Sequence, residues 1–111
     1  SHSYSNPNIK ITVVDSGPDS VDFAIMRLIK ENDLLITQDY GLSSLAISKG
    51  AIVLHPCGKI ININNIDTLL VNRYLNRIER KVSNHIKGPK KRTKANDEDF
   101  RKALINILTQ N

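Results

Sequence analysis

The chain has 111 residues, a formal net charge of +5 and 40% hydrophobic residues, which is typical of one globular domain. It has no apolar run near the roughly 20 residues that a membrane span requires, and its polar start lacks a signal-peptide core. Cys57 is the single cysteine, which excludes an internal disulfide and a cysteine-based zinc site. We therefore expect one cytoplasmic domain over residues 1–111, with no membrane partner.

The charge is distributed unevenly along the chain. Residues 1–72 carry five Lys/Arg and seven Asp/Glu, whereas residues 73–111 carry eleven Lys/Arg and four Asp/Glu. An acidic part and a basic part can face one polyanionic ligand, such as a nucleic acid. Solvated helix faces and a basic loop explain the same distribution without any ligand.

The first half of the chain alternates β-branched, apolar runs with segments of helical spacing. The Val13–Val14 pair indicates a strand that is buried on both faces, as in a parallel sheet. Strands are predicted at 9–15, 33–38, 51–55 and 60–64, and helices at 19–32 and 40–50. Helices that join consecutive strands favour parallel pairing, so the fold class is α/β, with a three-layer, mostly parallel sheet.

Two further helices are predicted in the second half. The first covers 65–86, with Asn65 as a possible N-cap. The second covers 97–110 and begins with acidic residues that suit the positive end of a helix. The basic segment between them, 87–94, contains Gly-Pro and is predicted to be a loop. The broad apolar side of the helix at 65–86 consists of Ile66, Leu69, Leu70, Tyr74, Ile78 and Val82.

Four carboxylates are predicted to meet at one edge of the sheet. Asp15 and Asp39 close the first two strands, whose carboxyl ends share an edge if the strands are parallel neighbours. Asp19 and Asp22 lie three residues apart in the first turns of the following helix, and so share a face. Such a cluster needs a positive partner, and Mg²⁺ or Mn²⁺ prefers oxygen ligands of this kind. A metal held there can activate water and stabilise displacement at phosphorus.

Helix capping is the competing explanation for these residues. Ser16 and Asp19 fit a capping box, and Asp39 fits the N-cap of the helix at 40–50. Asp22 lies beyond the capping positions, and Asp15 can simply end its strand in a turn. The convergence of all four on one edge is harder to explain by capping than any one of them alone.

Other candidate sites have weaker signals. His2, His55 and His85 lack metal-ligand spacing, and Cys57 has no evident base partner in the sequence. The segment at 87–94, after the helix predicted at 65–86, is basic but lacks the Walker spacing of a phosphate-binding loop. We predict that the cations of this segment contact nucleic-acid phosphates through charge alone. These cations are Lys87, Lys90, Lys91, Arg92 and Lys94.

Four segments in this order, VDSGPDSVDFAI, ITQDYGLSSLAISKGA, HPCGKI and GPKKRTKANDEDFRKAL, resemble the YaiI/YqxD family of uncharacterised bacterial proteins. The family's usual forms include VDSGPDAAD, TQD-x-x-LA and GPKPFTK, the last followed by an acid-rich helix start. The resemblance implies a PIN-like nuclease fold, because the TQD element is similar to the T-x-D element of PIN nucleases. It also implies metal-dependent phosphodiester chemistry.

The sequence departs from the family at two places. The family begins with a strand carrying Asp-x-Asp-Ala-Cys-Pro, which is absent here, so we expect a truncated PIN-like domain with an open sheet edge able to pair with another copy. GPKKRT replaces GPKPFT and makes the loop more basic.

The sequence leaves three hypotheses about function. The first is a nuclease acting on RNA or single-stranded nucleic acid, with Asp39, Asp22 and Asp19 as catalytic residues. The second is a non-catalytic nucleic-acid-binding module, and the third is a structural domain whose aspartates only cap helices.

Overall fold

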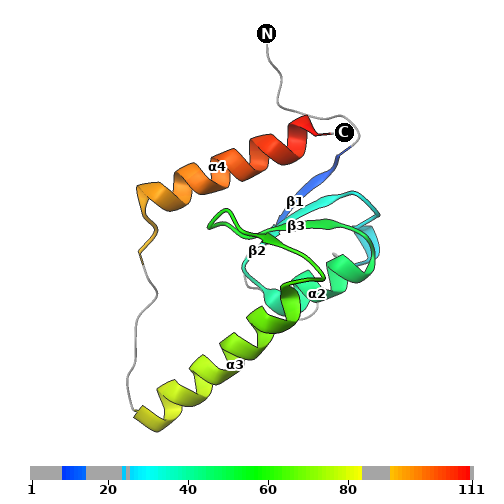
Figure 1. Ribbon diagram of the computed structural model, residues 1–111. Helices are drawn as coiled ribbons and strands as arrows, with labels where there is room; N and C mark the ends of the chain where they lie inside the picture. The colour runs from blue at the N-terminus through cyan, green and yellow to red at the C-terminus, as the bar shows by residue number, and fades with distance from the viewer. Residues whose placement is uncertain (1–8, 15–23, 25, 84–90, 111) are drawn as a thin grey trace.

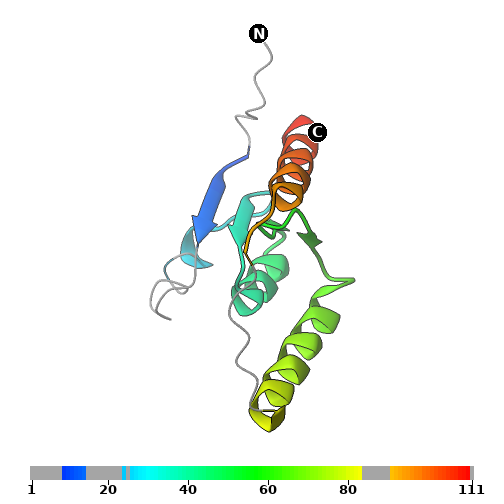
Figure 2. The same ribbon diagram turned by 90° about the vertical axis from the view of Figure 1, so that its left-hand side faces the viewer.

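A computed structural model describes residues 9–14, 24, 26–83 and 91–110. Four strands form one sheet, with helices on both of its faces (Figures 1 and 2). The strands are β1 (Ile11–Val14), β2 (Leu34–Thr37), β3 (Ile52–Leu54) and β4 (Ile60–Ile61). The helices are α2 (Tyr40–Ser48), α3 (Ile66–Ser83) and α4 (Lys94–Thr109). Within the helix predicted at 19–32, the described positions Ala24 and 26–28 are helical.

The strands lie in chain order, β1-β2-β3-β4. The first three are parallel, with Ile11 opposite Leu34 and Leu34 opposite Ile52, and β4 returns antiparallel to β3. The predicted α/β class and the mostly parallel sheet are therefore confirmed, and the arrangement is compatible with a PIN-like three-layer fold. Because β1 and β2 are parallel neighbours, their carboxyl ends share one edge, with Val14 opposite Thr37.

Alternation along β2 explains the two apolar layers. Leu35 packs on the side of α2 and the first turns of α3, in a cluster that includes Leu42, Ala46 and Ile66. Leu34 and Ile36 face the other side, where α4 supplies Phe100, Leu104 and Ile107. All four residues of β2 are buried, as expected of a parallel strand covered on both faces.

Only the beginning of α3 packs against the sheet layer, which corrects the predicted apolar face. Ile66 is buried, but Tyr74 is 61% exposed and Val82 is 82% exposed, because α3 extends away from the sheet (Figures 1 and 2). The side chain of the predicted cap Asn65 bonds to residues that precede it, and not to the start of α3. Its Oδ1 accepts from the backbone N of Asn62, and its amide donates to the carbonyl of Ile60.

The last helix begins three residues earlier than predicted. The hydroxyl of Thr93 accepts from the backbone N of Asn96, and the side-chain oxygen of Asn96 accepts from the backbone N of Thr93, which forms a reciprocal capping box. Lys94 is therefore the first helical residue of α4, and not the end of the basic loop.

Strand β1 lies at the edge of the described sheet, and Ile11 and Val13 are exposed there, so the prediction that this strand is buried on both faces was wrong. Pairing of this edge with a second copy stays a prediction. In the part of the chain that the structure describes, every helix is too short or too polar to cross a membrane.

Candidate functional site

Asp39 lies between the end of β2 and the start of α2 and is the N-cap of that helix. Its Oδ1 accepts a hydrogen bond from the backbone N of Leu42 at 3.0 Å. Its own backbone N donates to the hydroxyl of Thr37 at 3.1 Å, and its carbonyl accepts from the hydroxyl of Ser43 at 2.7 Å. The capping explanation for Asp39 is thus confirmed. The cap uses one carboxylate oxygen, which leaves Oδ2 with lone pairs for a further ligand.

The other three predicted carboxylates, Asp15, Asp19 and Asp22, lie outside the described residues. The strand ends that precede Asp15 and Asp39 are adjacent, since Val14 is paired with Thr37. Within the described ranges, no three His, Cys, Asp or Glu side chains gather closely enough to hold a metal ion. The four-carboxylate metal site therefore stays a prediction.

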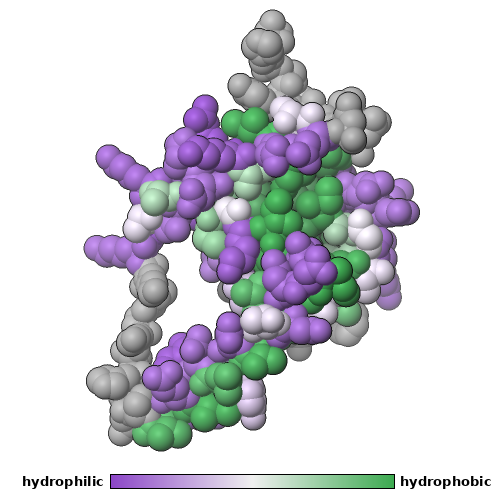
Figure 3. Space-filling model, viewed as in Figure 1, coloured by the Kyte–Doolittle hydropathy of each residue, from purple (hydrophilic) through white to green (hydrophobic). Residues whose placement is uncertain are grey.

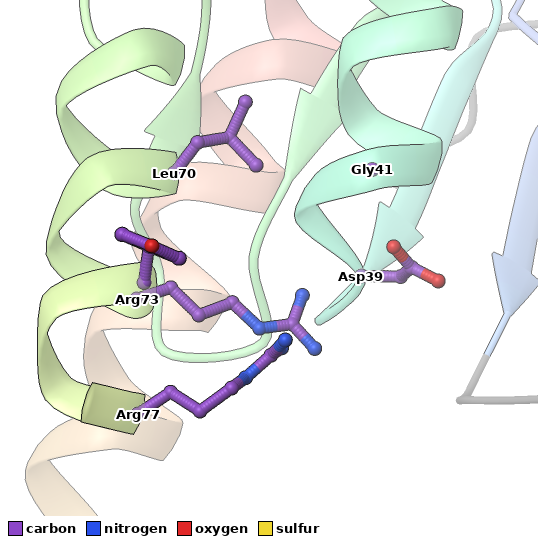
Figure 4. A pocket seen from close by; sticks show the side chains of 6 residues that line it. Asp39, Gly41, Leu70, Arg73 and Arg77 are labelled. Carbon is purple, nitrogen blue, oxygen red and sulfur yellow. The ribbon is translucent and has the colours of Figure 1, made fainter.

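A groove of about 280 Å³ opens beside Asp39, between the start of α2 and the middle of α3. In Figure 4 the side chains of Arg73 and Arg77 extend from α3 toward the start of α2. The carboxylate of Asp39 points to the opposite side, toward β1. The groove thus has a cationic wall, and the carboxylate sits at its border. Its lining residues are Asp39, Gly41, Leu70, Arg73, Tyr74 and Arg77.

Sequence reasoning missed these two arginines, although their spacing contained a signal. Ile66, Leu70, Arg73 and Arg77 are spaced i, i+4, i+7 and i+11, which places them on one side of α3. That side packs on the core at Ile66 and partly at Leu70, then changes to arginine where the helix leaves the sheet. The arginines therefore face the edge of the domain beside Asp39.

A small cluster of titratable residues adjoins the same edge. The ring centroids of Tyr40 and His55 lie 5.9 Å apart, and Nδ1 of His55 accepts from the backbone N of Cys57 at 3.0 Å. Burial lowers the pKa of the His55 imidazole below its ordinary value, and the nearby cations Lys59 and Arg92 lower it further.

Tyr40, the first residue of α2, links this cluster to the groove. Burial raises the pKa of its hydroxyl, Cys57 raises it further, and Arg73 lowers it. Arg73 and Gly41, near the start of α2, also line the same groove. His55 itself has a structural role in the turn after β3, because its ring nitrogen accepts from the backbone N of Cys57.

The predicted phosphate contacts are only partly described, since Lys87 and Lys90 lie outside the described residues. Lys91 and Lys94 are exposed. Arg92 pairs with Asp97, donates to the carbonyl of Pro56 at 2.8 Å and lies 5.9 Å from the centre of the Phe100 ring. Arg92 thus ties the start of α4 to the turn after β3. Phosphate binding by the five predicted cations stays a prediction.

Comparison with known proteins places this architecture in a family. The family profile described as "Uncharacterized BCR, YaiI/YqxD family" matches residues 1–110. The chain belongs to the YaiI/YqxD family. No solved structure matches the chain.

Relatives of the YaiI/YqxD family cover most of this chain. A UPF0178 protein of Bacillus cereus is 46% identical over 109 residues, which are 95% of this chain and 75% of that protein. A UPF0178 protein of Staphylococcus aureus is 44% identical over 92% of this chain and 67% of its own length. One of Clostridium acetobutylicum is 40% identical over 88% of this chain and 68% of its own length. The matched relatives are thus longer than the matched region, and the motif-based recognition of the family is confirmed.

Proposed function

We propose that this YaiI/YqxD protein is a divalent-metal-dependent nuclease that acts on single-stranded nucleic acid, with RNA as the expected substrate. The observation that carries the proposal is the position of Asp39. It follows the buried strand β2 at the edge where β1 also ends, and one of its carboxylate oxygens is not used by the helix cap. Ligands of parallel α/β sheets bind beyond the carboxyl ends of the strands.

The residues assigned to the reaction are Asp39, Asp22 and Asp19, with Asp15 in support. Carboxylate oxygens suit Mg²⁺ or Mn²⁺, and Asp39 offers such an oxygen without giving up its cap. When bound, the metal would polarise a phosphodiester oxygen and lower the pKa of a water molecule. The protein would hold the metal in place and orient the strand beside it.

A non-catalytic nucleic-acid-binding module is the second candidate, and the cap of α2 favours it. The hydrogen bond from the backbone N of Leu42 to Oδ1 explains why an aspartate stands at position 39 without any metal. In such a module the arginines beside the groove would bind phosphate, and the acidic edge would have no catalytic role.

Cleavage of a fluorescently labelled single-stranded RNA in Mn²⁺ separates the two candidates. We expect cleavage by the 111-residue chain and loss of cleavage, by at least tenfold, in Asp39→Asn and in Asp22→Asn. Asp67→Asn is the matched control, because Asp67 is exposed in the first turn of α3 and is not among the residues that line the groove beside Asp39. Binding of RNA without cleavage by the unmodified chain would support the binding module, and cleavage that survives in Asp39→Asn would refute the assigned site.

A further inference from the structure

We propose that Arg73 and Arg77 bind the phosphodiester backbone of a single-stranded nucleic acid in the groove beside the start of α2. This inference rests on the proposed function, because it places the substrate strand of that reaction along α3. It adds a binding surface that is distinct from the basic segment at 87–94.

The positions of the two arginines suit contact with one strand. They are four residues apart, so they lie on the same side of α3 and are separated by about 6 Å along the helix axis. Both side chains are exposed, and both extend toward the start of α2 (Figure 4). A backbone lying in the groove would therefore meet two guanidinium groups in succession and continue past Asp39.

The charge of the two arginines is not neutralised within the described ranges. The ion pairs found there join Arg92 to Asp97 and Arg101 to Glu98. Asp39 is the carboxylate among the described residues that line the groove; it accepts from the backbone N of Leu42 and points away from the arginines (Figure 4). Guanidinium groups that have no ion pair in the described part of the chain can attract an anion, and their planar donor geometry fits phosphate oxygens.

The cationic side continues beyond the groove to the end of α3. Arg73, Arg77, Arg80 and Lys81 are spaced i, i+4, i+7 and i+8, so they form one stripe along the helix. A stripe of this length suits an extended polyanion better than a single small anion, because each further phosphate finds another cation. Figure 3 shows the hydrophilic surface that runs along α3 beside its exposed apolar residues.

Tyr74 gives a second reason to favour an oligonucleotide. It also lines the groove, it lies between the two arginines in the sequence, and it is 61% exposed. Proteins that bind single-stranded nucleic acids usually combine two features: a groove whose cations follow the backbone, and an aromatic ring on which a base can stack. An inorganic phosphate would make no use of this ring.

Fluorescence anisotropy with a labelled 12-nucleotide oligo-U RNA tests the proposal on the full 111-residue chain. Binding is measured in EDTA at several salt concentrations, so that neither metal nor cleavage affects the result. In Arg73→Gln plus Arg77→Gln we expect the Kd to rise at least tenfold. The negative slope of log K against log salt should become shallower by about 1.4, since each phosphate contact in a single strand contributes about 0.7 to its magnitude.

Arg101→Gln plus Lys102→Gln is the matched control, because it removes the same charge from an exposed stretch of α4. We expect it to change the Kd by less than twofold. An equal loss in both double variants would mean diffuse attraction and would overturn the proposal, as would an unchanged Kd in the groove variant. Both variants should keep the unmodified melting temperature, since all four side chains are exposed.

Two further measurements identify the ligand. Tyr74→Leu should weaken RNA binding about tenfold, because stacking on an aromatic ring contributes about 1–3 kcal/mol per base. Inorganic phosphate should displace the RNA only at concentrations far above that of a competing unlabelled oligonucleotide. Equal potency per phosphate would identify a small-anion site and refute the backbone assignment. RNA binding in EDTA without Mn²⁺-dependent cleavage would refute the proposed nuclease and leave this binding surface standing.

Discussion

The backbone N of Leu42 donates to Oδ1 of Asp39 at 3.0 Å, so the carboxylate at the end of β2 also begins α2. Because of this bond, substitution can separate the capping role of Asp39 from its proposed role in binding a metal. Asn and Ser cap helices about as well as Asp, whereas Ala cannot accept the bond.

Asp39→Ala should therefore destabilise the fold by about 1 kcal/mol, the usual cost of losing a helix N-cap. Asp39→Asn and Asp39→Ser should stay close to the unmodified chain in the free energy of unfolding. Urea denaturation followed by circular dichroism measures the differences. If all three variants were equally destabilised, the carboxylate charge, and not the capping bond, would be what stabilises α2.

Gly58 should be intolerant of a side chain because it lies against the backbone of α4. Its φ is +95°, and a Cβ there would come within 2.6 Å of the carbonyl carbon of Asp99. Gly58→Ala should therefore cost the left-handed backbone penalty of about 1–2 kcal/mol and a further penalty of about 1–3 kcal/mol for overpacking. Thermal unfolding measures the total loss.

Gly50→Ala is the matched control for this substitution. Gly50 also has a positive φ, +84°, but its Cβ would come close only to the flexible side chain of Glu31, at 3.0 Å from Cγ, and would lie at an ordinary contact distance of 3.7 Å from the Glu31 Cα. It should show the backbone penalty alone. Equal losses at the two glycines would contradict the close packing of α4 on the turn after β3.

Arg92 should contribute to stability, whatever its role toward phosphate. Arg92→Gln removes its contacts with Asp97, the Pro56 carbonyl and the Phe100 ring, and should cost about 1 kcal/mol, since the pair is partly exposed. Lys91→Gln, at an exposed neighbouring position, should leave the melting temperature unchanged. A melting temperature that is equally unaffected in Arg92→Gln would show that these contacts do not hold α4.

His55 should make the protein less stable in mild acid. Its pKa is lower in the folded chain than the ordinary value of 6.5, so the unfolded chain takes up the proton first. This contribution to stability is complete above about pH 6.5 and is lost as the pH falls toward the folded-state pKa. Protonation would also remove the Nδ1 acceptor that binds the backbone N of Cys57.

Melting temperatures between pH 5 and 7.5 test this effect of His55. His55→Asn keeps a side-chain acceptor for the backbone N of Cys57 and cannot titrate, so it should flatten the decline toward pH 5. A decline of the same steepness in His55→Asn would assign the acid sensitivity to other groups.

The sheet was predictable from the sequence because local patterns determine it. Parallel strands that are buried on both faces have near-continuous apolar runs, and the three apolar residues that begin Leu34–Thr37 form such a run. The pattern of α3 was less informative, because periodicity shows that a helix has an apolar side but not whether another element covers it. Ile78 and Val82 have the correct spacing for a core and are nevertheless exposed.

The site was predictable at Asp39 but not at the arginines. The end of a strand and the start of a helix are both visible in sequence, so capping and ligand binding were both foreseen for Asp39. The groove requires the tertiary position of α3 beside α2, which places Arg73 and Arg77 near a residue more than thirty positions earlier. The Thr93 cap was missed because Asn96, instead of the more usual Glu or Gln, closes its capping box.

The most direct test of the central claim, that Asp39 holds a metal as well as capping α2, is the effect of Mn²⁺ on the melting temperature. The unmodified chain should be stabilised by several degrees, since a ligand at 100 times its Kd adds about 2.7 kcal/mol. Asp39→Asn, which keeps the cap, should lose most of that shift. An equal shift in both proteins, or none in the unmodified chain, would contradict a metal at Asp39.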